Sequence, residues 1–204
     1  CEENDLFLME DCCESHGATH QGKKVGTFGN VSNFSFYFGH HITTIEGGMI
    51  CTNSSELADL LRMYRSHGMT RELSSAELKQ KYEADYPDLN PDFIFSIPAF
   101  NVRNNEIGAI LGMNQLKRLD SNVESRTKNQ SLFFSGLSKE FYRTDYLFEG
   151  SSNYAFNIVL NENNPSLAEK LKRAMNEVGI ENRRGSAGGG NQLRQPYLRK
   201  LYKD

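Results

Sequence analysis

The residues with the clearest capacity for chemistry are two adjacent histidines, His40 and His41, which follow an aromatic segment and precede a Glu-Gly-Gly turn. A histidine can act as a proton shuttle, as a metal ligand or as an ordinary structural residue. A zinc site needs further ligands at characteristic spacings, and the other histidines, His16, His20 and His67, supply no such spacing. The pair therefore favours proton transfer beside an organic cofactor over metal binding.

Asp11 and Ser35 are candidates to hold such a cofactor. Asp11 ends an apolar run at residues 6–11, which is typical of a buried parallel strand, and ligands bind at the carboxyl ends of such strands. A carboxylate there either caps a turn or holds a cation, and a pyridinium nitrogen is a cation that pyridoxal enzymes pair with an acid. Ser35 precedes His40 by five residues, within a predicted strand. A serine on a strand is usually an ordinary surface residue, whereas a serine at a strand end that faces a phosphate can donate its hydroxyl to it.

A glycine triplet at residues 188–190 lies within a basic segment and is flanked by Arg183, Arg184 and Arg194. Successive glycines can present backbone N–H groups to an anion, although a triplet alone also occurs in ordinary loops. The segment is therefore either a solvated basic loop or a clamp for a diphosphate-linked substrate.

The overall composition excludes some classes of function. A formal net charge of −3, with 24% charged residues in 204, gives no sign of a nucleic-acid or membrane surface. No apolar run is long enough to span a membrane, and no signal peptide is recognised. The four cysteines form no disulfide framework, which predicts a reducing, cytoplasmic setting. Because the chain lacks an initial Met and stops in a basic helical segment, we expect it to be an internal fragment of a longer protein.

The elements that position the candidate residues are predicted to alternate between strands and helices. Segments rich in β-branched and aromatic residues are predicted strands: residues 6–11, 31–38, 47–52 and 153–160. Segments with apolar side chains at helical spacing are predicted helices: residues 54–68, 104–138 (one long helix or two joined helices) and 165–179. Glycine-rich and proline-containing stretches are predicted to connect them: a loop or hairpin at 17–30 and a long irregular connection at 70–100. A domain boundary is expected near residue 125.

The order of these pieces resembles the DegT/DnrJ/StrS family of sugar aminotransferases, in the fold-type I class of pyridoxal-phosphate enzymes. The resemblance covers nearly the whole chain and is carried by four segments: MEDCCESHGA, GTFGNVSNFSFYFGHHITTIEGGMICT, RSHG and FNVRNNEIGAILGMNQLKRLD. It implies an α/β protein with a three-layer α/β/α large domain and a small C-terminal α/β domain. Residues 1–125 would be the C-terminal portion of the large domain, and residues 126–204 would be the truncated small domain.

The resemblance also implies roles for individual residues. Asp11 would hold the pyridine nitrogen of pyridoxal 5′-phosphate, and Ser35 would bind its phosphate. Asn101 would reach the phosphate of the neighbouring subunit's cofactor, so a homodimer is expected. The arginines Arg183, Arg184 and Arg194 would bind the nucleotide-sugar substrate.

Residue 40 is where the sequence departs from the family's aminotransferases. Those enzymes carry a lysine five residues after the serine, and this lysine bonds covalently to pyridoxal phosphate; an imidazole cannot form that bond. A branch of the family carries two histidines here and uses pyridoxamine 5′-phosphate to remove the 3-hydroxyl of a nucleotide-linked 4-keto-6-deoxyhexose. The resemblance therefore implies that His40 is the base that moves the protons. Glutamate would restore the cofactor amine, and the product would enter a surface polysaccharide such as an O-antigen.

Other functions compete with the dehydratase. A second two-histidine branch holds an iron–sulfur cluster on four cysteines, and it is disfavoured because no cysteine follows Cys51. A nucleotide-sugar aminotransferase that works without its lysine is one alternative, and a catalytically silent paralogue that binds nucleotide sugar is another. Retention of Asp11 and Ser35 argues against the silent paralogue. Ile45 is a further departure, since the family usually has a glycine there.

Overall fold

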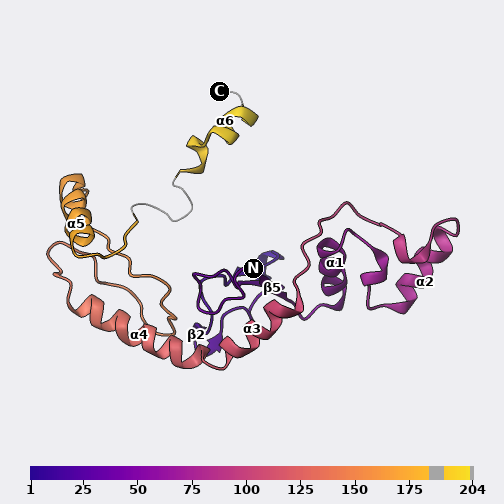
Figure 1. The fold of residues 1–204 in the computed structure, drawn as a ribbon, viewed down its shortest axis with the longest axis horizontal. Coiled ribbons are helices and arrows are strands. Elements are labelled where there is room, and N and C mark those ends of the chain that lie inside the picture. Colours follow the sequence, from indigo (N-terminus) through magenta and orange to yellow (C-terminus); the bar gives the residue numbers. More distant parts are fainter. Residues whose placement is uncertain (184–190, 203–204) are drawn as a thin grey trace. The chain divides into compact units, whose positions relative to one another are not determined.

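The computed structural model describes residues 1–183 and 191–202, which form a mixed α/β chain (Figure 1). Arg184 and the glycine triplet lie outside the described residues. The chain divides into two compact units: unit 1 is Cys1–Leu137 with Asp145–Asn157, and unit 2 is Ser138–Thr144 with Ile158–Asp204. The predicted boundary near residue 125 falls inside helix α4, and the division into residues 1–125 and 126–204 stays a prediction.

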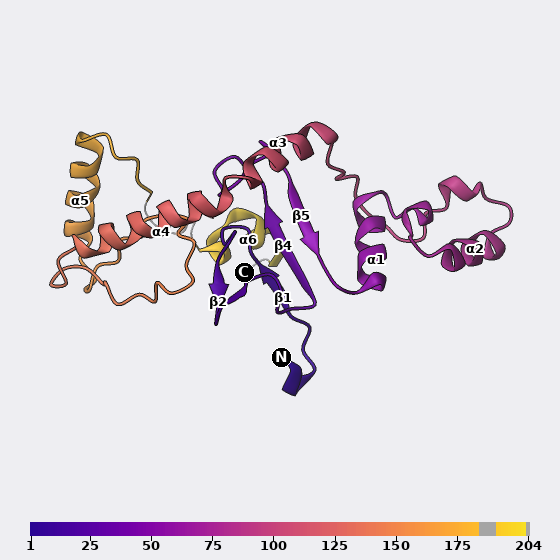
Figure 2. The same cartoon turned by 90° about the horizontal axis from the view of Figure 1, so that it is seen from below.

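The sheet that positions the site belongs to unit 1 and has three strands in the order β1-β4-β5 (Figure 2). Its strands are β1 (Met9–Asp11), β4 (Val31–Ser35) and β5 (Gly48–Cys51). β4 runs parallel to β1 and antiparallel to β5. The first three predicted strands are therefore confirmed, with shorter bounds.

β1 is not buried, contrary to the prediction from its apolar run. Leu6, Phe7 and Met9 are each more than half exposed. β1 is an edge strand of the sheet, and within the described residues no layer covers these side chains. An apolar run indicates a strand, but it does not show which other part of a protein covers it.

A short hairpin follows β1, as the glycine-rich segment predicted. Its strands are β2 (Thr19–His20) and β3 (Lys23–Lys24). Gln21 and Gly22 between them both have positive φ, of 51° and 77°. Positive φ at both central residues is typical of the two-residue turn that matches strand twist.

The helices end where caps and glycines predict. Ser54 accepts a hydrogen bond from the Leu57 N–H and begins α1. Gly68 follows α1 with φ +78°, and a Cβ at Gly68 would overlap the Ile97 carbonyl oxygen, so only glycine fits there. The segment predicted as one helix or two is two joined helices. The helices are α1 (Ser55–Arg65), α2 (Ala76–Asp85), α3 (Glu106–Leu116), α4 (Leu119–Ser135), α5 (Pro165–Glu177) and α6 (Pro196–Tyr202). Within the described ranges, no helix is long and apolar enough to cross a membrane.

The prediction of an irregular connection over residues 70–100 is wrong at α2. The Ser75 side chain caps α2 by accepting from the Leu78 N–H, but no α2 residue is buried. Without a buried face the helix leaves no apolar periodicity in the sequence. The rest of the connection is ordered, because Met69, Leu73 and Ile94 are buried, as is Met63 of α1.

The strand predicted at residues 153–160 does not form, apart from a single bridge between Tyr142 and Leu160. The carbonyl groups of Ser152, Asn153 and Tyr154 accept hydrogen bonds from side chains instead of from a neighbouring strand. Aromatic and β-branched content alone does not supply the partner edge that a strand needs.

Asp59 anchors the start of the α2 segment to α1. Its buried carboxylate accepts from the Ser74 N–H at 2.8 Å and from the Arg62 guanidinium at 2.9 Å. Burial alone would raise the pKa of Asp59, but these hydrogen bonds and one from the Ser75 N–H outweigh it and hold the pKa below its usual value.

We expect Asp59→Ala to destabilise the protein by about 2 kcal/mol at neutral pH, because three donors lose a charged acceptor. The lowered pKa means that this stabilisation is complete above the usual aspartate pKa and is lost as pH falls through the lower folded-state value. Thermal unfolding of the full-length wild type and variant between neutral and acidic pH measures it. A difference in stability that does not shrink at acidic pH would contradict the assignment.

Candidate active site

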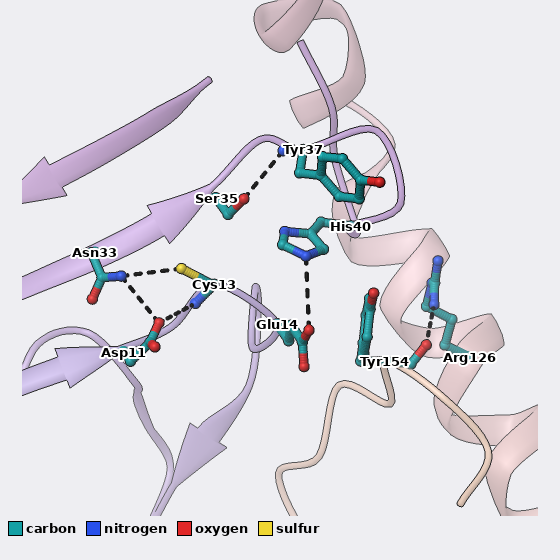
Figure 3. A network of polar contacts seen from close by, with 9 residues as sticks. All are labelled: Asp11, Cys13, Glu14, Asn33, Ser35, Tyr37, His40, Arg126 and Tyr154. Atoms are coloured by element: carbon teal, nitrogen blue, oxygen red, sulfur yellow. Dashed lines mark hydrogen bonds and ion pairs between the residues drawn. The ribbon is translucent and has the colours of Figure 1, made fainter. Parts of the chain in front are cut away.

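Asp11, at the carboxyl end of β1, lies beside Asn33 in the middle of β4, because the parallel register pairs these two residues (Figure 3). The Asp11 carboxylate accepts from the Asn33 side-chain amide at 3.1 Å and from the Cys13 N–H at 3.2 Å. Hydrogen bonds from the Cys13 thiol and backbone hold the pKa of Asp11 below its usual value. Asp11 is therefore an ionised, oriented carboxylate that suits a bound cation.

Sequence reasoning missed Asn33 and Cys13. Burial is the largest cause that raises the pKa of the Cys13 thiol to about 11, and its hydrogen bond to Asp11 is the second. The thiol therefore stays protonated and acts as a hydrogen-bond donor to Asp11. The strand register is the signal that finds Asn33, since a residue 22 positions away lies directly beside Asp11.

Ser35 is the last residue of β4, which ends three residues earlier than the predicted strand at 31–38. Its Oγ accepts from the Tyr37 N–H at 3.2 Å, and a hydroxyl that accepts one bond keeps its hydrogen to donate. A hydroxyl donor at the end of a strand that neighbours Asp11's strand suits an anionic group of the same ligand.

His40 lies in the turn that follows β4, where its N–H donates to the Tyr37 carbonyl at 3.0 Å. Its Nε2 lies 3.8 Å from a Glu14 carboxylate oxygen (Figure 3). Its ring contacts the Tyr37 and Tyr154 rings edge-on, with centroids 5.5 Å and 5.4 Å away. The His40 side chain is only 12% exposed, and its Nδ1 is buried without a hydrogen-bond partner among the described residues. The His40 ring is therefore largely enclosed and has a carboxylate near one nitrogen, unlike the ring of a surface histidine.

His41 points into the protein instead. It is buried, and its Nε2 lies 2.6 Å from the Ser152 carbonyl oxygen. Burial lowers its pKa, so the ring is neutral and Nε2 donates to the carbonyl. His16 packs beside it, and burial lowers the pKa of His16 to about 4. In residues 1–183 and 191–202, no three His, Cys, Asp or Glu side chains gather as a metal site.

Tyr154 is a contact of His40 that no sequence pattern indicated. It lies in Asp145–Asn157, the second stretch of chain in unit 1, and its backbone carbonyl accepts a hydrogen bond from Arg126 of α4 at 3.2 Å. Glu14 and Tyr154 also line a hollow of about 390 Å³ in unit 1, together with Ser15, Ser152 and Asn157. Glu14 and Tyr154, two of the side chains beside His40, therefore also line this hollow.

Asn101 makes contacts other than with this cluster in the described part of the chain. Asn101 is exposed, forms a backbone bridge with Ser66 and accepts from Arg103 at 3.2 Å. Arg183, which pairs with Glu181 at 3.5 Å, and Arg194 belong to unit 2. Their roles in cofactor and substrate binding stay predictions.

Ile45, the departure from the family's glycine, has a φ of +75°. A positive φ is costly for a β-branched residue, so a glycine suits this position. Its side chain is 68% exposed, so burial does not compensate.

We expect Ile45→Gly to raise the free energy of unfolding by about 1 kcal/mol. Glycine relieves the backbone strain at residue 45, and the greater entropy that it gives the unfolded chain offsets part of this gain. Thermal unfolding of the full-length protein measures it, with Ile45→Val as the control that keeps the strain. If the glycine variant is no more stable than the valine variant, the backbone at residue 45 is not strained.

Comparison with known proteins supplies the context for this geometry. The model of the DegT/DnrJ/EryC1/StrS aminotransferase family matches residues 1–188. GDP-4-keto-6-deoxy-D-mannose 3-dehydratase of Yersinia pseudotuberculosis is 37% identical over 181 residues, which are 88% of this chain and 46% of that protein.

Two solved structures are similar in fold. The E. coli GDP-4-keto-6-deoxy-D-mannose-3-dehydratase with bound hydrated PLP matches with a TM-score of 0.78 and 30% identity, over 98% of this chain and 51% of that one. A GDP-4-keto-6-deoxymannose-3-dehydratase with a trapped PLP-glutamate geminal diamine matches with a TM-score of 0.70 and 30% identity, over 87% and 46%. The chain spans about half the length of these relatives.

Proposed function

Because this chain belongs to the DegT/DnrJ/EryC1/StrS aminotransferase family, as its sequence predicted, we propose that its protein is a pyridoxamine-phosphate-dependent 3-dehydratase of a nucleotide-linked 4-keto-6-deoxyhexose. One observation carries the proposal: His40 lies in the turn just after β4, five residues after Ser35 and beside the Glu14 carboxylate, and the family resemblance implies that this is the position of the aminotransferases' lysine. A GDP-linked sugar is the first candidate substrate, since the relatives described above are named for one.

The residues present fit the cofactor. Asp11 is ionised and oriented to hold a protonated ring nitrogen, and Ser35 has a hydroxyl hydrogen for the phosphate. Asn33 Oδ1 and His40 Nδ1 are buried and lack partners among the described residues, so both keep hydrogen-bonding capacity at this site. When bound, the cofactor supplies an amine that joins the keto group of the sugar and a ring that accepts electrons.

The chemistry assigned to this chain is proton transfer by His40. With the cofactor bound, the imidazole would accept a proton at the reacting centre and would give it to the departing 3-hydroxyl, which would leave as water. The Glu14 carboxylate, 3.8 Å from Nε2, would place a negative charge beside the imidazolium. The sum of the reaction is sugar plus glutamate giving 3-deoxy sugar, 2-oxoglutarate and ammonia, and the C3–O bond is the bond that breaks.

Several properties of the whole protein follow from the same proposal. The protein acts in the cytoplasm as a homodimer, and Asn101 of one subunit reaches the cofactor phosphate of the other. Its product enters surface-polysaccharide biosynthesis. Arg183, Arg184 and Arg194 bind the nucleotide part of the substrate.

A nucleotide-sugar aminotransferase is the second candidate, because the matching family model is one of aminotransferases. The two reactions differ in the fate of nitrogen. A dehydratase releases the amino nitrogen of glutamate as ammonia, whereas an aminotransferase keeps it in the sugar. A silent paralogue does neither.

The test uses the full-length protein with pyridoxamine phosphate, glutamate and a panel of GDP-, UDP-, dTDP- and CDP-linked 4-keto-6-deoxyhexoses. Ammonia and 2-oxoglutarate are measured together. We expect equal amounts of both with at least one sugar, the GDP-linked one first. Formation of 2-oxoglutarate without ammonia would favour the aminotransferase, and formation of neither would favour the silent paralogue.

A further inference from the structure

The second histidine of the pair is joined to the site by residues 150–154, which we call the strap. Each carbonyl of the strap accepts a hydrogen bond from another part of unit 1. The donors, in strap order, are the Thr19 N–H (2.8 Å), the Thr127 hydroxyl (3.1 Å), His41 Nε2 (2.6 Å) and Arg126, which donates to the last two carbonyls at 3.3 Å and 3.2 Å. The strap is therefore held along its length by side chains and a hairpin rather than by a strand.

The strap ends at Tyr154, whose ring meets the His40 ring edge-on at an interplanar angle of 82° (Figure 3). Tyr37 makes a second edge contact with His40, at 71°. His41 is thus bonded to the strap only two residues before the tyrosine that touches its neighbour His40.

Apart from the Tyr37 and Tyr154 rings, the contacts described for the His40 ring do little to fix its rotation. The torsion that turns an imidazole about its Cβ–Cγ bond has broad minima. The 3.8 Å between His40 Nε2 and Glu14 is longer than a hydrogen bond, so the carboxylate attracts the ring without aligning it. A base must present its nitrogen within hydrogen-bond reach of the proton that it takes.

We propose that Tyr154 is a positioning residue for the His40 imidazole, and that His41 acts through Tyr154 by holding the strap. The proposal rests on the function proposed above. The adjacent histidines then have separate tasks, since His40 moves protons and His41 never meets the substrate. The neutral, buried state of His41 supports this, because a neutral ring donates one stable hydrogen bond.

The kinetic test compares variants of the full-length protein. We expect His41→Leu and Tyr154→Leu each to lower kcat about tenfold or more with little change in KM, because small misplacement of a catalytic group is costly. His41→Gln, which keeps a donor at a similar reach, and Tyr154→Phe, which keeps the ring, retain most of the activity. The double variant should lose no more than Tyr154→Leu alone, and multiplied losses would show that His41 does not act through Tyr154.

His16→Leu is the matched control. His16 is as buried as His41 and packs against it, but its ring nitrogens have no hydrogen-bond partner in the described chain. Its replacement leaves every strap hydrogen bond in place, so kcat should stay within about twofold. A loss equal to that of His41→Leu would mean that the cluster matters only as packing.

A second readout does not depend on the reaction. The ring proton resonances of His40 in isotope-labelled protein report the Tyr154 ring beside it. We expect these resonances to shift in both Tyr154→Leu and His41→Leu and to stay in place in His16→Leu. Shifts without a change in kcat would confirm the ring contact but overturn the positioning role, and unshifted resonances would overturn it at the contact itself. Shifts in a protein whose wild type shows no dehydration would reject only the proposed function.

Discussion

Replacing His40 by asparagine is expected to lower the rate of dehydration about a thousandfold, because an amide can fill the space of the ring but cannot carry a proton between two atoms. Asp11 and Ser35 are untouched, so cofactor affinity should stay within a few-fold. Single-turnover ammonia release measures the rate, and the absorbance of bound cofactor measures the affinity.

His20 supplies the control for this experiment. It is an exposed histidine of the β2–β3 hairpin, and His20→Asn should leave the rate unchanged. A rate for His40→Asn within tenfold of the wild type would show that another group, or water, is the base. The mechanism proposed here would then be wrong even if the product were a deoxy sugar.

Asp11→Asn is expected to weaken pyridoxal-phosphate binding about tenfold and to lower turnover about a thousandfold. The asparagine cannot pair with a protonated ring nitrogen, and an unprotonated ring accepts electrons poorly. Because hydrogen bonds from Cys13 lower the pKa of Asp11, wild-type affinity should hold as pH falls until it passes below the usual aspartate range. Spectrophotometric titration with pyridoxal phosphate measures both effects.

Glu10 is a suitable control because it is the adjacent carboxylate in the sequence and stabilises a loop. It accepts from the backbone N–H groups of Gly26, Phe28 and Gly29 at 2.6 Å, 2.7 Å and 2.6 Å, and so holds the loop before β4. Glu10→Gln should lower thermal stability and leave cofactor affinity nearly unchanged. If it weakens cofactor binding as much as Asp11→Asn, the effect at Asp11 is one of loop structure and not of charge.

The parts of the site that were predictable from sequence are those fixed by local pattern. Asp11 ends an apolar run, so it was expected at the end of a strand, and the structure has it there. Ser35 was expected within the strand at 31–38, and it is the last residue of β4. The mixed α/β fold, like the family, is confirmed by similarity over nearly the whole chain. His40 was singled out by its distance from Ser35, which is a property of the sequence alone.

The parts that were missed depend on contacts between distant residues. Asn33 lies beside Asp11 because of the β1–β4 register. Tyr154 lies beside His40 because side chains of α4 and His41 donate hydrogen bonds to the carbonyl groups of the strap. Because these carbonyl groups bond to side chains, they do not pair with a neighbouring strand, and the expected strand at 153–160 is absent from the described residues. Helix α2 was missed for a different reason, since a helix with no buried face shows no apolar period.

The central claim is that the sugar loses an oxygen and gains no nitrogen. The most direct measurement is the mass spectrum of the sugar product formed by full-length protein from a GDP-linked 4-keto-6-deoxyhexose, pyridoxamine phosphate and ¹⁵N-glutamate. The account predicts a product with one oxygen fewer, free of ¹⁵N, with the label recovered as ammonia. A sugar that carries ¹⁵N would contradict it and make the protein an aminotransferase that works with His40 in place of a lysine.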